Sequence, residues 1–263
     1  MAAFLVVTRR TLLGAAWVGA SAEALARAPA PRAPRQLVML DPGHGGKDPG
    51  AVGAAGTFEK HIALATAIEL KWQLEAGGRC RVELTRGRDV FVPLEERVRR
   101  AQRRGAALLV SLHADALPDR GVRGASVYTL SNTASDAQTE ALARRENSAD
   151  RFDPGGRGVS PAVANILASL VRRETRAGSA RAARELVGSL KGQVPLLTNP
   201  ARHAGFAVLR AADVPSVLVE IGFMSNSLDE AALRRADHRA RVAFAIRRAL
   251  EAALAPSDRG LAG

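Results

Sequence analysis

Two histidines and two glutamates are the residues of this chain whose types and spacing suit catalysis. His44 stands in the glycine-rich run LDPGHGG at residues 40–46, and His113 follows the apolar run LLVSL. Glu59 opens a long amphipathic segment, and Glu220 ends the apolar run SVLVE. Two imidazoles and one carboxylate are the ligands of many catalytic zinc sites, which leave the fourth position open for water. A further carboxylate can then serve as general base, so this set is typical of metal-assisted hydrolysis.

Each of the four residues also has an ordinary structural explanation when it is taken singly. A histidine in a glycine-rich loop is more often hydrogen-bonded than metal-bound, and Glu59 suits the first turn of a helix, where negative charge is stabilised. His113 and Glu220 are more informative, because each places a polar side chain at the end of a strand that is otherwise apolar. A buried carboxylate needs a partner or a raised pKa, and both are common at catalytic sites. Together the four residues indicate one site.

Apolar runs and amphipathic segments alternate from residue 36 onward. Near-continuous apolar runs predict strands at residues 36–41, 80–84, 107–112, 125–130, 206–209 and 216–220. Helical periodicity predicts helices at residues 58–76, 94–104, 135–147, 160–175, 179–191 and 236–254. The alternation predicts an α/β fold: a single domain with a mostly parallel or mixed sheet of about six strands and helices on both faces.

The predicted elements bring the candidate residues together. His44 and His113 follow the C-terminal ends of strands, where open α/β sheets place their ligand sites. Glu59 lies in the first turn of the next helix, beside the loop that contains His44. The apolar positions of that helix are expected to face the sheet, at Ile62, Ala65, Ile68 and Trp72.

The other three histidines are weaker candidates. His61 and His238 lie among polar and basic residues of predicted helices and are expected at the surface. His203 lies before the predicted strand at 206–209 and is a candidate to line the cleft.

Composition limits the classes of function. The 263 residues, 47% of them apolar, can bury one full domain, and the net charge of +12 is almost entirely arginine. The arginines are scattered along helices, without a nucleic-acid-binding motif or aromatic platform, so a basic surface suited to an anionic polymer is expected and nucleic-acid binding is not. The single cysteine, Cys80, excludes an internal disulfide and is expected to be buried in a strand.

Residues 1–26 have the organisation of an export signal. Arg9 and Arg10 precede a modestly apolar run, and the run ALA at 24–26 offers the small residues that a signal peptidase reads. The paired arginines resemble a twin-arginine signal, which predicts a periplasmic protein; a disordered basic arm is the alternative. The apolar run is too short to span a membrane comfortably. A linker at 27–35, a catalytic domain at 36–254 and a flexible tail at 255–263 are expected to follow.

Three motifs resemble those of zinc-dependent N-acetylmuramoyl-L-alanine amidases of the type-3 family. They are LDPGHGG at 40–46, SLHAD at 111–115 and PSVLVEIGFMSN at 215–226. The motifs are long and correctly ordered, and the resemblance extends over residues 36–254.

The resemblance implies a ligand set and a reaction. In that family the residues that match His44, Glu59 and His113 bind Zn²⁺, and the residue that matches Glu220 is the catalytic acid/base. The implied reaction is hydrolysis of the amide between N-acetylmuramic acid and L-alanine of peptidoglycan, in wall remodelling and daughter-cell separation. The residues alone indicate only metal-assisted amide hydrolysis. Another zinc amide hydrolase, such as a carboxypeptidase, and a non-catalytic wall-binding or activator protein are the alternatives.

A long connection suggests control of the site. About 75 residues separate the predicted strands at 125–130 and 206–209, far more than a usual connection. Some members of the resembled family fold such an insertion across the cleft, where an acidic residue occupies the open zinc position. Glu146, within the insertion at 131–178, is the candidate for this inhibitory ligand, and a protein activator would then be a partner. A solvated acid paired with neighbouring arginines is the alternative for Glu146.

Overall fold

The computed structural model describes residues 35–152 and 173–255. The expected export signal, the expected tail beyond residue 255 and most of the predicted helix at 160–175 lie outside the described residues. The elements in chain order are β1 Gln36–Pro42, α1 Glu59–Gly77, β2 Cys80–Leu84, α2 Leu94–Arg103, β3 Leu108–His113, β4 Ala125–Leu130, α3 Ala137–Asn147, η1 Ser148–Phe152, α5 Arg173–Leu190, β5 Leu196–Ala204, η2 Ala207–Leu209, β6 Ser216–Glu220, α6 Ser227–Arg234 and α7 Ala236–Ala253.

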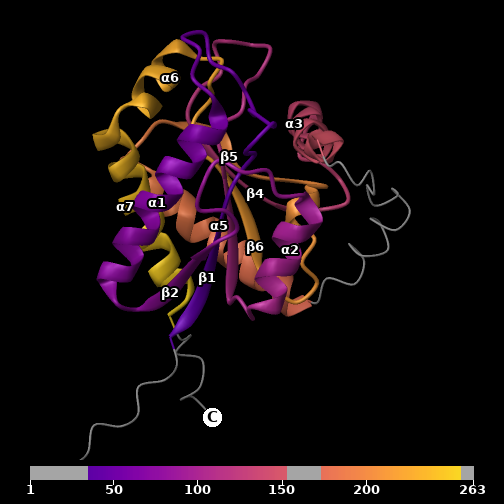
Figure 1. The fold of residues 1–263 in the computed structure, drawn as a ribbon, viewed down its shortest axis with the longest axis vertical. Helices are drawn as coiled ribbons and strands as arrows, with labels where there is room; N and C mark the ends of the chain where they lie inside the picture. The colour runs from indigo at the N-terminus through magenta and orange to yellow at the C-terminus, as the bar shows by residue number, and fades with distance from the viewer. Residues whose placement is uncertain (1–34, 153–172, 256–263) are drawn as a thin grey trace, which may run out of the picture. The chain divides into compact units, whose positions relative to one another are not determined.

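The described strands form one mixed six-stranded sheet in the order β2-β1-β3-β6-β4-β5 (Figure 1). The strands β2, β1, β3 and β6 run parallel, whereas β4 is antiparallel to β6 and parallel to β5. The expected fold class is therefore confirmed. Because β1, β3 and β6 are parallel neighbours, their C-terminal ends share one edge of the sheet.

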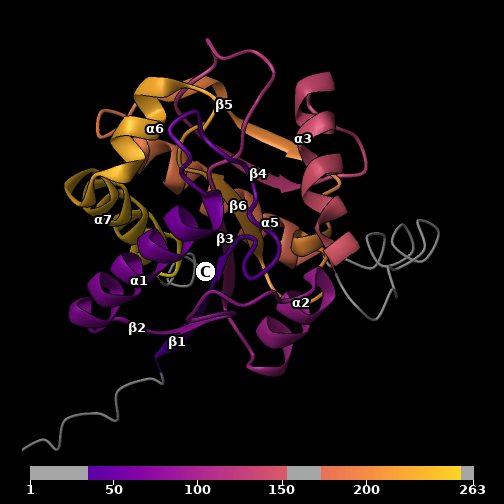
Figure 2. The same cartoon turned by 45° about the horizontal axis from the view of Figure 1, so that its top comes forward.

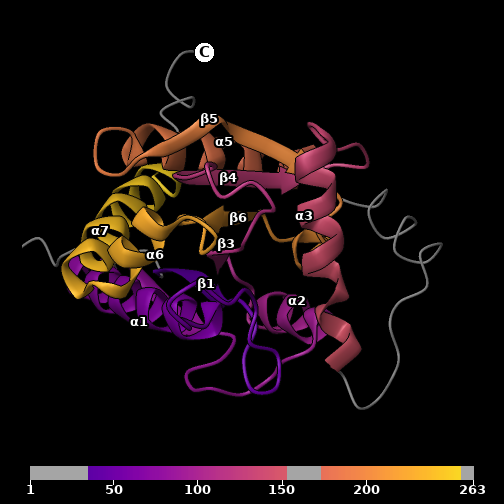
Figure 3. The same ribbon diagram turned by 90° about the horizontal axis from the view of Figure 1, so that it is seen from above.

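Helices cover both faces of the sheet. Within β1, Val38 and Leu40 pack into the core beneath α1, α5 and α7, whereas Leu37 and Met39 pack with residues of α2 on the opposite face. This alternation follows from the two-residue period of a strand. Figures 2 and 3 show α1, α6 and α7 on one side of the sheet and α2 and α3 on the other. None of the described helices is long and apolar enough to cross a membrane.

One predicted strand is wrong. Residues 206–209 contain the short helix η2, and the strand that pairs with β4 is β5, Leu196–Ala204. The apolar residues Phe206, Val208 and Leu209 pack in a buried cluster with α3 and do not pair with a strand. Strand β5 lies at the edge of the sheet and is largely polar, so it has no continuous apolar run, and it contains a proline of the kind that edge strands accept.

The predicted buried face of α1 is also partly wrong. Ile62 is buried, but Ile68 and Trp72 are 48% and 67% exposed. The face toward the sheet and α7 consists mainly of small residues and leucines, including Ala63, Ala67, Leu70 and Leu74. Close packing against two neighbours favours alanine, so the largest apolar side chains were a poor guide to this face. Two further differences are α6, which was not predicted, and α5, which continues from Arg173 without the expected break before Ser179.

Candidate metal centre

The shared edge of β1, β3 and β6 holds three of the predicted site residues. His44 lies two residues beyond β1, His113 is the last residue of β3, and Glu220 is the last residue of β6. His113 and Glu220 are direct partners in the β3–β6 register. The parallel order of the strands therefore brings together residues that are far apart in the chain.

Four buried side chains converge beside this edge. They are His44, Glu59, His113 and Glu146, and one possible ligand atom from each lies within 4.8 Å of those of all the others. Glu59 Oε1 is 3.1 Å from both His44 Nε2 and His113 Nδ1. Glu146 Oε2 is 3.0 Å from His113 Nδ1 and 3.5 Å from His44 Nε2. The structure thus brings Glu146 to the three predicted ligands. The alternative prediction, that Glu146 is a solvated acid, is wrong because the side chain is buried.

Two backbone N–H groups position Glu59, the fully buried first residue of α1. Ala51 N–H donates to Oε2 at 2.8 Å, and Ala114 N–H donates to Oε1 at 2.9 Å. Ala114 directly follows His113, so the same strand end positions both His113 and the carboxylate. The side chain keeps its direction because charge-assisted bonds to backbone N–H groups are strong.

Glycines allow the loop after β1 to pass close to the cluster. A side-chain carbon added at Gly43 would come within 2.4 Å of the His113 ring, and one added at Gly50 would come within 2.6 Å of both Glu59 and His44. Gly50 also has a φ of 67°, and His44 itself has a φ of 59°. The glycine-rich sequence is therefore needed for close approach of the backbone to the two histidines.

Charges inside the cluster shift its titration. Burial disfavours protonated His44, but the nearby Glu59 and Glu146 carboxylates outweigh this and raise the pKa of His44 to about 10. Burial acts the same way on His113, and Glu146 and Glu59 raise its pKa well above the usual value. The carboxylates therefore favour positive charge at this point of the structure. Because a metal ion binds neutral imidazole, a dication at this site would bind more weakly as the pH falls.

Glu220 is fully buried beside the cluster. Its Oε2 accepts a hydrogen bond from Asp115 N–H at 3.0 Å, whereas Oε1 has no hydrogen-bond partner among the described residues. Burial raises the pKa of Glu220 well above the usual range; His113 opposes this shift, and the Glu59, Asp115 and Glu146 carboxylates add to it. Such a carboxyl group can hold a proton near neutral pH and release it to a neighbour.

Two acidic residues of the site were missed from the sequence. Asp48 Oδ2 lies 2.8 Å from His44 Nδ1, and Asp115 Oδ2 accepts a 2.5 Å bond from Arg145 of α3. Burial and the neighbouring Glu146 and Glu59 carboxylates raise the pKa of Asp115 to about 7, against the effect of Arg145. A carboxylate four residues after a loop histidine was the available signal for Asp48. The pairing of Asp115 with Arg145 had none, because it depends on the packing of α3.

The remaining histidines lie apart from the cluster. His61 is exposed, as expected. His238 was also expected at the surface, but it is half-buried. His203 is exposed on β5, and its Nδ1 is 3.1 Å from Ser135 Oγ; no contact joins it to the cluster within the described segments.

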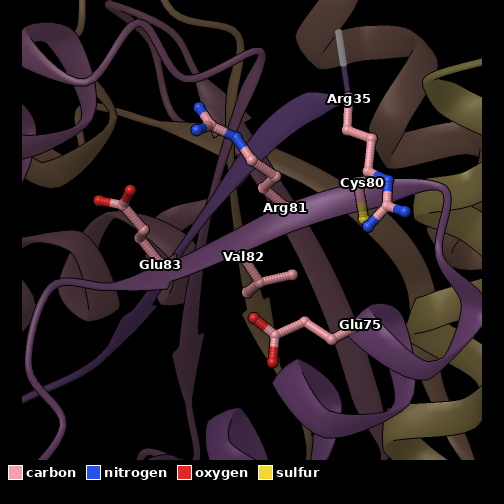
Figure 4. Close-up of a pocket in the computed structure, with 6 residues that line it drawn as sticks. All are labelled: Arg35, Glu75, Cys80, Arg81, Val82 and Glu83. Carbon is pink, nitrogen blue, oxygen red and sulfur yellow. The ribbon is translucent and has the colours of Figure 1, made fainter. Parts of the chain in front are cut away.

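A separate hollow surrounds Cys80 at the start of β2, which is the opposite end of the parallel strands (Figure 4). Arg35, Glu75, Cys80, Arg81, Val82 and Glu83 line it. Cys80 is buried with a free thiol, as expected, and burial raises the pKa of that thiol. This hollow is therefore not part of the candidate metal centre.

Comparisons with known proteins identify relatives of this chain by sequence and by fold. The chain is 38% identical over 211 residues to the N-acetylmuramoyl-L-alanine amidase AmiC of Escherichia coli O6:H1, covering 80% of this chain and 51% of that protein. It is also 38% identical over 216 residues to AmiA of E. coli K12, covering 81% of this chain and 74% of AmiA. The solved amidase AmiC2 of Nostoc punctiforme is 28% identical with a TM-score of 0.56, covering 82% of this chain and 94% of that structure.

The chain spans about half the length of the AmiC relative. The family model described as N-acetylmuramoyl-L-alanine amidase matches residues 38–252, which include most of β1 and all of the other described strands. The chain therefore belongs to the N-acetylmuramoyl-L-alanine amidase family.

Proposed function

We propose that this chain is a zinc-dependent peptidoglycan hydrolase. It cleaves the amide between N-acetylmuramic acid and L-alanine of the stem peptide, in wall remodelling and daughter-cell separation. The observation that supports this most directly is the convergence of His44, Glu59 and His113 at one sheet edge, beside the buried carboxyl of Glu220. The relatives AmiC and AmiA are both named N-acetylmuramoyl-L-alanine amidase, which also supports the proposal.

The donor set fits Zn²⁺. Two imidazoles and a carboxylate are ligands that zinc accepts in catalytic sites. His44 Nε2 is buried and makes no hydrogen bond to any described residue, although it faces Glu59. Its nearest polar atoms are carboxylate oxygens of Glu59 and Glu146, and a cation bound among these atoms would attract both oxygens and accept the nitrogen lone pair. His44, Glu59 and His113 would hold the ion, which would lower the pKa of a water and polarise the substrate carbonyl.

Glu220 performs the proton transfers in this proposal. Its Oε1 has no described partner and is the atom that accepts the proton of the attacking water. The hydrogen bond from Asp115 N–H holds Oε2 and thereby fixes the direction of Oε1. The raised pKa allows the carboxyl group to keep that proton and then donate it to the departing nitrogen of L-alanine.

We further propose that α3 inhibits the enzyme through Glu146. The Glu146 carboxylate lies against the same imidazole atoms that the metal would use, and it would compete there with water or substrate. Two contacts hold this end of α3: the ion pair of Arg145 with Asp115, and the Asn147 side chain, which bonds to the backbone of Gly205 and Ala207. An activator protein that displaces α3 would open the site.

Replacement of Glu146 by alanine should raise the basal rate of wall hydrolysis. If the open state makes up about a tenth of the molecules, removal of the plug raises the rate about tenfold. Release of dye-labelled fragments from purified wall measures the rate. Glu140→Ala is the matched control, because Glu140 lies on the same helix with an exposed side chain that pairs with Arg144. A folded Glu146→Ala protein that is no faster than the parent would place the gate elsewhere.

The reaction is tested by muropeptide analysis of purified wall after incubation with the mature protein. Products with free amino termini on L-alanine, formed only without a chelator, support the proposal. Amino acids released from the carboxyl end of the stem peptide would show a carboxypeptidase. Unchanged wall in the presence of Glu146→Ala protein and zinc would favour a non-catalytic wall-binding protein.

The place of action proposed is the periplasm, reached through the export signal at residues 1–26. Peptidoglycan is the partner that this location offers, and the excess of arginine suits a polymer that bears carboxylates. Cell fractionation tests the location: the mature chain should appear with periplasmic markers and not in the cytoplasm. We propose no nucleic-acid partner and no stable membrane span for this protein.

A further inference from the structure

A buried polar network lies beneath the two histidines. At its centre is Asp41 of β1, which is fully buried and accepts hydrogen bonds from three side chains. Thr85 Oγ1 and Arg97 Nη1 donate to Oδ1, the latter at 2.9 Å, and Ser111 Oγ donates to Oδ2 at 2.7 Å. Burial raises the pKa of Asp41, but Arg97 and the two hydroxyls outweigh burial and leave that pKa below its usual value. Asp41 is therefore an ionised carboxylate that can only accept.

The ionised state of Asp41 determines the direction of the next hydrogen bond. A serine hydroxyl has one proton, and the proton of Ser111 is donated to Asp41. The contact of 3.1 Å between Ser111 Oγ and His113 Nε2 can then form only if Nε2 carries a proton and donates it. In a neutral imidazole this leaves the lone pair on Nδ1, the atom that faces Glu59 at 3.1 Å.

In His44 the proton and the lone pair lie on the opposite ring nitrogens from those of His113. The Nδ1 atom of His44 contacts the Asp48 carboxylate at 2.8 Å, so in the neutral imidazole the proton lies on Nδ1 and the lone pair on Nε2, which faces Glu59. The two histidines thus present different ring nitrogens to the same point. One is fixed by a carboxylate directly, and the other by a carboxylate that acts through a serine.

We propose that Asp41 and Ser111 are positioning residues that keep the ring proton of His113 on Nε2 and thereby make Nδ1 its metal-binding atom. This inference rests on the metal site of the proposed function. Asp41 also influences His44, because its partner Arg97 donates to the backbone oxygens of His44 and Pro42, each at 2.7 Å. One buried carboxylate thus supports both imidazoles, by a hydroxyl on one side and a guanidinium on the other.

Nitrogen-15 NMR of the zinc-loaded full chain tests the proton positions without any substitution. We expect the ring proton of His113 on Nε2 and that of His44 on Nδ1. Ser111→Ala should weaken zinc binding by about 10–100-fold, the usual effect of losing a partner that orients a ligand. Competition with a chromogenic chelator measures this binding. Ser111→Thr keeps the hydroxyl and should restore zinc affinity to near that of the parent.

Thr85→Val is the matched control. Thr85 is as buried as Ser111 and also donates to Asp41, but it has no described contact with His113. Thr85→Val should lower the melting temperature while zinc affinity stays close to that of the parent, because the ion pair with Arg97 still keeps Asp41 ionised. The inference would be wrong, and the proposed metal site would still stand, if His113 carries its proton on Nδ1 or if a folded Ser111→Ala protein has unchanged zinc affinity. A parent protein that binds no zinc overturns the metal site and the inference with it.

Discussion

Glu220→Gln should reduce the rate of amide hydrolysis by about 10²–10⁴-fold, the usual range for a lost general acid/base. Glutamine has nearly the same shape and can still accept the hydrogen bond from Asp115 N–H at its amide oxygen, so the local structure should persist. It cannot take a proton from water or return one to the leaving nitrogen. The change should therefore lower kcat, while bound zinc stays at one ion per chain because Glu220 is not in the cluster of close ligand atoms.

Two measurements on the same sample separate this expectation from loss of the fold. Metal analysis and the far-ultraviolet circular dichroism spectrum should match those of the parent while turnover falls. Near-normal turnover in a folded, zinc-loaded Glu220→Gln protein would move the base to another residue. In that case Asp115, whose pKa is raised to about 7, is the next residue to replace.

His44→Ala and His113→Ala should each abolish bound zinc and with it the activity. Each removes one of the two imidazoles from a set of three proposed protein ligands and leaves the Glu59 carboxylate with fewer neutralising partners. The sheet is formed by backbone hydrogen bonds and apolar packing away from the cluster, so most secondary structure should remain. Metal analysis after dialysis should find essentially no zinc, and the residual rate should equal that of the parent treated with chelator.

His61→Ala is the matched control for both histidine substitutions. His61 lies in the same first turns of α1 as Glu59, but its side chain is 55% exposed and faces Asp89 at 3.6 Å. Zinc content and rate in His61→Ala should match those of the parent. Full zinc content in either His44→Ala or His113→Ala would remove that residue from the ligand set.

The sequence predicted only in part which side chains are buried and against which elements they pack. The exposure of Trp72 and the helical turn at residues 207–209 both contradict expectations drawn from apolar patterns. An apolar run indicates burial but does not say whether the burying contact is a strand partner or a neighbouring helix. The largely polar edge strand β5 escaped prediction because backbone pairing with β4, and not its side chains, makes it a strand.

The α/β fold and the sheet edge at which His44, His113 and Glu220 meet could be predicted from the pattern of residues alone. Strand ends and loop glycines are local features, and parallel pairing brings the ends of β1, β3 and β6 to one edge without further information. The contact of Glu146 with the imidazoles, and the contacts that link Asp41 to both histidines through Ser111 and Arg97, became visible only in the folded chain. The contacts of Glu146 and Arg97 depend on how α3 and α2 pack against the sheet, and the contact of Asp41 with Ser111 depends on the register of β1 and β3. Packing of this kind depends on contacts between residues far apart in the chain, which the pattern of one sequence does not record.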